Sequence, residues 1–171
     1  MAKKNPDKVL GSIFKIWKTL KLGTGLQTAD DFRNALKKIG CQTGNYANDL
    51  LGKPEFKAAT KEIEVDLVIL TTSELTGKRE GGTTTEVFAG AERLGLDRCP
   101  PEVGPQLRLQ YKDQPNGECL LIGMEPISDS GGYLEVFCVE RDDSDRWLDS
   151  DCGNTEDFWF GSYQWVFLRR K

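Results

Sequence analysis

Apolar positions recur with two different periods along this chain of 171 residues. In the N-terminal part they return every three or four residues, which is the spacing of an amphipathic helix. This pattern predicts helices over 6–21, 29–39 and 44–51, the second of them opened by Thr28 and Asp31 as a capping box. The chain is therefore expected to begin with helices.

Further along, apolar residues occupy every second position instead, as in a half-buried strand. Residues 62–70 show this alternation first. A helix is then predicted over 84–94, because Thr83 and Glu86 form a second capping box. The other segments with strand character, separated by the turn sequences DQPNG, SDSGG and DCGNTED, are 106–112, 118–125, 133–140, 145–149 and 163–169.

This order of elements predicts an α+β fold, in which N-terminal helices precede a mainly antiparallel sheet of about five strands covered on one face by helices. The expected division is a helical region over 1–60 and a sheet domain over 61–171, which together could form one compact unit. Residues 1–60 carry 11 Lys/Arg against 5 Asp/Glu, whereas residues 61–171 carry 12 against 22. Such asymmetry either attracts the two parts to each other or serves a charged partner.

The composition is that of a soluble globular protein, with 38% hydrophobic and 29% charged residues. No apolar run approaches the roughly 18–20 residues that a membrane-spanning helix needs. Lysines interrupt the N-terminal apolar positions, which is not the pattern of a secretory signal. We therefore expect a cytoplasmic protein.

The chain contains no histidine and five cysteines, none of them in a CxxC pair. Unpaired thiols in a reducing compartment are the simplest interpretation. The absence of histidine excludes every catalytic triad that uses an imidazole, and it removes the commonest metal ligand. Cys99 and Cys119 are too far apart in sequence to resemble a zinc motif, so neither a metal nor a cofactor is predicted.

The segment 99–127 is the first candidate for a binding site. If 106–112 and 118–125 pair as a hairpin, Arg108, Gln110 and Glu125 share its polar face, where Arg108 and Glu125 form a cross-strand ion pair. The second candidate is an acidic loop that contains Asp142, Asp143 and Asp145. The alternative is that the polar face is the ordinary solvated side of a sheet and the acids form an ordinary solvated loop.

These features favour a cytoplasmic, non-enzymatic binding protein that engages a protein partner through the polar sheet face and the acidic loop. The partner and the oligomeric state do not follow from the sequence.

Two alternatives stay open. The segment FRNALKKIGCQTGNYANDLLG resembles a helix-turn-helix, which implies a DNA-binding regulator. The side chains that would contact DNA are Arg33, Lys37, Lys38, Gln42, Asn45 and Asn48. The third possibility is an enzyme that works without histidine through carboxylates such as Glu102, Glu118 and Glu125, through Tyr111 or through a thiol.

Overall fold

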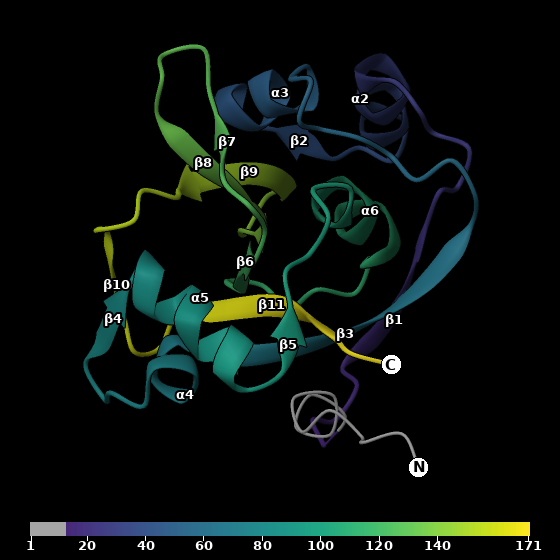
Figure 1. Cartoon of the computed structure of the whole chain (residues 1–171). Helices are drawn as coiled ribbons and strands as arrows, with labels where there is room; N and C mark the ends of the chain where they lie inside the picture. The colour runs from purple at the N-terminus through teal and green to yellow at the C-terminus, as the bar shows by residue number, and fades with distance from the viewer. Residues whose placement is uncertain (1–12) are drawn as a thin grey trace.

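The computed structural model describes residues 13–171, and a large curved sheet runs through their centre (Figure 1). The helices of this part of the chain are α2 (Ala29–Lys38), α3 (Asn45–Leu51), α4 (Thr72–Thr76), α5 (Thr84–Arg93) and α6 (Val103–Gln110). Its strands are β1 (Lys18–Leu22), β2 (Gln42–Thr43), β3 (Ile63–Thr71), β4 (Gly81–Thr83), β5 (Leu96–Asp97), β6 (Cys119–Ile122), β7 (Ile127–Ser128), β8 (Leu134–Arg141), β9 (Arg146–Cys152), β10 (Phe158–Phe160) and β11 (Gln164–Arg169).

Nine strands form one mixed sheet that curves into a half-barrel. Its order is β1-β3-β11-β6-β8-β9-β2, with β5 beside β11 and β7 beside β8. β11 runs parallel to β6 and β2 runs parallel to β9, whereas the other neighbours are antiparallel. The prediction of helices followed by a mainly antiparallel sheet of about five strands is therefore wrong, although it rested on the usual layer rules.

The N-terminal strands explain part of this error. Residues 6–12 of the predicted helix over 6–21 lie outside the described residues, but Lys18–Leu22 at its end forms β1. Leu20 and Leu22 are buried, and the strand pairs with β3 along its whole length. Apolar residues two apart fit a strand as well as a helix, and the long pairing with β3 decides between them.

Three of the predicted helices are confirmed, as α2, α3 and α5. In α2 and α5 the capping boxes Thr28/Asp31 and Thr83/Glu86 form as expected. In each box the threonine hydroxyl accepts a hydrogen bond from the backbone N–H of the acid, and the carboxylate of the acid accepts one from the backbone N–H of the threonine. A third capping box, Thr71/Glu74, opens α4 in a segment for which the sequence pattern predicted no helix.

The largest local difference is α6, which replaces the predicted strand over 106–112. Leu107 and Leu109 alternate with polar residues, but Val103 to Arg108 are all buried, so the helix has no solvent-facing stripe to reveal its period. It packs closely on β8, because a Cβ at Gly104 would lie 2.8 Å from the Phe137 side chain. The predicted hairpin therefore does not exist.

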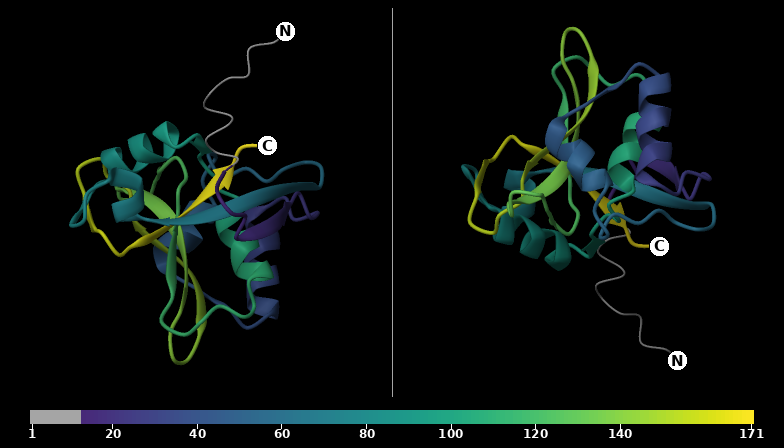
Figure 2. Two further views of the ribbon diagram at one scale, coloured as in Figure 1. Left: turned by 90° about the horizontal axis from the view of Figure 1, so that it is seen from below. Right: turned by 90° about the horizontal axis from the view of Figure 1, so that it is seen from above.

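The other predicted strands are confirmed as β3, β6, β8, β9 and β11. Helices cover both faces of the sheet rather than one. Figure 2 shows α4 and α5 on one side and α2, α3 and α6 on the other. Phe88 of α5 contacts Trp165 and Phe167 of β11, with ring centroids 6.0 and 6.1 Å apart.

No helix within residues 13–171 is long and apolar enough to cross a membrane. The five cysteines all lie in this part of the chain and are free. The division at residue 60 stays a prediction, but the described residues before it supply β1 and β2, the two ends of the sheet order.

Candidate acidic binding face

Acidic side chains gather on the outer part of the sheet, over β8 and β9. Cys138 lies opposite Asp149, and Val136 lies opposite Asp151 in the antiparallel register. Directly opposed residues share a face, and so do residues two apart on one strand. Glu140, Asp149 and Asp151 therefore point to the same side, and we call these three residues the acidic face.

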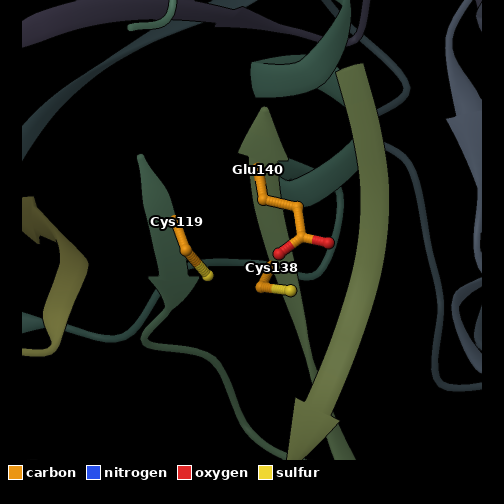
Figure 3. A group of neighbouring side chains, drawn as sticks. All are labelled: Cys119, Cys138 and Glu140. Carbon is orange, nitrogen blue, oxygen red and sulfur yellow. The ribbon is translucent and has the colours of Figure 1, made fainter. Parts of the chain in front are cut away.

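Two thiols border this face. Cys119 of β6 is paired in register with Glu140 of β8, and Cys138 is two residues from Glu140. Both sulfur atoms and a Glu140 carboxylate oxygen lie within 4.8 Å of one another. Figure 3 shows the three side chains on the same side of the two strands.

The acidic face is electrostatically uncompensated. Burial raises the pKa of Glu140 and of Asp151, and the charge of Asp149 raises both further. Among residues 13–171, no ion pair neutralises Glu140, Asp149 or Asp151. The fold thus holds three partly buried acids together without a cation between them.

An aromatic hollow of about 330 Å³ adjoins Asp151. Its lining residues are Asp151, Cys152, Asp157, Phe158, Trp159, Phe160 and Tyr163. Trp159 is anchored by donating its indole N–H to Thr84 Oγ1 at 2.9 Å, whereas Phe158 and Phe160 are 53% and 66% exposed. Asp157 Oδ2 is buried and has no hydrogen-bond partner among the described residues.

Arg108, the centre of the predicted polar face, is fully buried in α6. Its guanidinium donates to Gln114 Oε1 (2.5 Å), Glu140 O (3.0 Å) and Tyr111 O (2.6 Å). It is therefore a structural residue and is not available to a partner.

Gln110 and Glu125 are separated from Arg108 and from each other. Gln110 bridges α6 to β1, accepting from the Lys21 N–H and donating to its carbonyl. Glu125 is exposed and pairs with Arg98, and both line a hollow beside α5. The structure does not bring the three residues together.

The acids of the predicted loop lie in the β8–β9 turn. Asp142 accepts hydrogen bonds from the N–H groups of Ser144 and Asp145 and from Trp147 Nε1, and these bonds lower its pKa. Asp143 and Asp145 line a second hollow whose other charged residues are Lys112, Arg141 and Arg146. The turn is therefore mixed in charge, and the uncompensated acids lie on the strands that flank it, Glu140 on β8 and Asp149 and Asp151 on β9.

The candidate DNA-binding residues surround α2 and α3. Arg33 is engaged with Asp30 and Asn48, while Lys37, Lys38, Gln42 and Asn45 are exposed. A strand, β2, pairs with β9 between the two helices, where a helix-turn-helix has only a turn. DNA binding stays a hypothesis.

The glutamates considered for catalysis are dispersed. Glu102 is buried and accepts from the N–H groups of Gly23 and Ala59 at 2.8 and 2.7 Å. Glu118 accepts from the Tyr111 hydroxyl, and burial followed by this contact raises the Tyr111 pKa to about 12. Glu102 and Glu118 therefore have structural contacts that account for their positions.

Sequence reasoning missed the group of Cys119, Cys138 and Glu140, which we call the thiol cluster, and it missed the aromatic hollow. Cys99, which we compared with Cys119, instead donates its thiol to Val166 O and is buried. One signal for the thiol cluster was available in the sequence. Cys138 and Glu140 are two residues apart on a predicted strand, and such residues share a face of the sheet. The hollow had a weaker signal, the FWF triplet at 158–160, which lay in no predicted element.

Comparisons of the chain with protein-family models, with curated proteins and with solved structures found no match.

Proposed function

We propose that this protein is a non-enzymatic binding protein that engages a basic segment of a protein partner through the acidic face and the aromatic hollow. The observation that carries the proposal is the set of acids held without a counter-cation beside exposed aromatic rings. The proposal includes a cytoplasmic location, which accords with five free thiols.

Charge complementarity selects the occupant. Partly buried carboxylates repel one another, and a Lys or Arg side chain placed between them removes that repulsion. Asp151 contributes to both the acidic face and the hollow, so one cation can contact both.

The rings of the hollow supply the second interaction. Tyr163 and Phe160 stack with centroids 6.5 Å apart, and Trp159 meets Tyr163 edge-on at 5.5 Å. Aromatic faces attract ammonium and guanidinium groups, and exposed aromatic residues are frequent anchors at protein interfaces. A basic side chain with a long aliphatic stem fits this combination best.

The test is titration with a synthetic unstructured peptide rich in Lys and Arg, with an acidic peptide of equal length as the comparison. We expect calorimetry to detect binding of the basic peptide alone, weakening as salt is added. Asp151→Asn with Asp157→Asn should weaken binding about tenfold or more, because it removes the charges at the hollow.

The matched control is Glu55→Gln with Glu64→Gln, which removes the same charge from exposed positions elsewhere. Equal weakening by both double variants would show that only net charge matters and would refute the proposed site. Phe160→Ala separates the aromatic contribution, since it leaves every charge in place.

A further inference from the structure

The thiol cluster, which consists of Cys119, Cys138 and Glu140, shares Glu140 with the acidic face, but the proposed function makes no use of its two thiols. Cys119 and Cys138 come from different strands, and the antiparallel register places them with Glu140 on one face. Cys138 is buried, whereas Cys119 and Glu140 are half-buried, so the group is open on one side.

We propose that Cys119, Cys138 and Glu140 bind one thiophilic divalent cation, with Zn²⁺ as the best match. Two sulfur ligands and one carboxylate favour zinc, whereas Ca²⁺ and Mg²⁺ prefer ligand sets made of oxygen. Both thiols release their protons to solvent when they coordinate the ion.

The geometry is close to that of a bound site. Zinc–sulfur bonds of about 2.3 Å and zinc–oxygen bonds of about 2.1 Å place tetrahedral ligand atoms roughly 3.4–3.8 Å apart. The three ligand atoms already lie within 4.8 Å of one another. Side-chain rotations that draw them together by about 1 Å complete the set, with no change in the pairing of the strands.

The surroundings favour a cation. Asp149 lies directly opposite Cys138 on β9, and its carboxylate contacts the backbone at Gly44, where a Cβ would come within 2.1 Å of Oδ1. The Asp149 carboxylate lies against Gly44 and is not part of the group whose ligand atoms lie within 4.8 Å of one another, so a water molecule would take the fourth position. A divalent cation bound there would reduce the repulsion of Asp149 on Glu140 and Asp151.

The first experiment titrates the full chain, with all five thiols reduced, with Co²⁺ as a spectroscopic substitute for zinc. We expect one equivalent to give a thiolate-to-cobalt charge-transfer band and the visible bands of a tetrahedral site, both abolished by Zn²⁺. Cys119→Ser and Cys138→Ser should each remove the charge-transfer contribution of one thiolate, and Glu140→Gln should weaken binding about tenfold or more.

Cys152→Ser is the matched control, because Cys152 is half-buried like Cys119 but lies outside the cluster. It should leave the cobalt spectrum and affinity unchanged. A spectrum that survives Cys119→Ser with Cys138→Ser, or no band at all from the fully reduced protein, would overturn the proposal.

A second measurement does not depend on the variants being folded. Zinc should slow the alkylation of Cys119 and Cys138 in the natural chain several-fold and leave Cys152 unaffected, as read by mass spectrometry of the labelled peptides. Equal alkylation of Cys119 with and without zinc would refute the site. Neither experiment involves a peptide, so its outcome is independent of the proposed function.

Discussion

The charged groups on the two sides of β8 differ in whether the protein itself supplies their partners. On one side, the buried guanidinium of Arg108 donates to three uncharged oxygens, one of which is the backbone carbonyl of Glu140. On the other side, the carboxylate of Glu140 lies with Asp149 and Asp151, and no cation pairs with them in the described part of the chain.

This difference distinguishes Arg108, whose charge is used within the fold, from the acidic face, whose charges are available to a ligand. Burial lowers the pKa of Arg108, but its hydrogen bonds close the C-terminal end of α6 and tie it to β8. Both terminal nitrogens of Arg108 have acceptors, and only its Nε is buried without a partner among the described residues. On the acidic face, Asp149 and Asp151 each accept from a backbone N–H, but no cation of the described residues pairs with them, so a ligand cation can supply the missing positive charge.

The largest expected effect follows replacement of Arg108. Arg108→Met keeps much of the volume but leaves Gln114 Oε1, Glu140 O and Tyr111 O without their donor. We expect the free energy of unfolding to fall by on the order of 3 kcal/mol, because buried unsatisfied acceptors are costly. Urea unfolding followed by circular dichroism measures this loss.

Arg33→Met is the control, since Arg33 also makes hydrogen bonds but is partly exposed, and its loss should be less than about 1 kcal/mol. Arg108→Lys should restore only part of the stability, because an ammonium lacks the planar fork of donors. If Arg108→Met were as stable as the natural chain, Arg108 would not be a structural residue.

The success of sequence reasoning at α5 and its failure at α6 have the same cause. α5 has a capping box and an amphipathic pattern, both local, so its position could be predicted from a dozen residues. α6 has no side-chain cap and is buried along most of its length. Its alternating leucines then resemble a strand, and only its contacts with β1 and β8 show otherwise.

The candidate site could be predicted only in part, for a similar reason. An acidic loop around Asp142, Asp143 and Asp145 was predicted, but Asp142 and Asp143 accept hydrogen bonds within the protein, and the uncompensated acids lie on the flanking strands β8 and β9. The approach of Cys119 to Cys138 depends on the register between β6 and β8, which neither strand pattern specifies alone.

A smaller effect is expected in the pH dependence of stability. Burial raises the pKa of Glu135 and of Asp151 in the folded protein. Folding then favours their protonated forms, so their contribution is present below the ordinary carboxyl pKa of about 4 and is lost as the pH rises through the raised values. Glu135→Gln with Asp151→Asn should therefore reduce the fall in stability between about pH 4 and pH 7.

Urea midpoints at several pH values test this expectation. Asp142→Asn is the opposite control, because hydrogen bonds lower the pKa of Asp142 and its contribution is present above the ordinary value and lost as the pH falls. This variant should lose stability at pH 7 and approach the natural chain in acid. If the double variant had the same pH profile as the natural chain, the fold would not raise the pKa values of Glu135 and Asp151.

The smallest effect is expected at Glu125. Its ion pair with Arg98 is exposed on both sides, so Glu125→Gln should change the free energy of unfolding by less than about 0.5 kcal/mol. Arg98 also lies 4.4 Å from the centroid of the Phe88 ring, and Arg98→Ala should lose up to about 1 kcal/mol because the ring contact disappears as well. If Glu125→Gln instead matched the loss at Arg108, exposure would not separate binding charges from structural ones in this fold, and the contrast across β8 would fail with it.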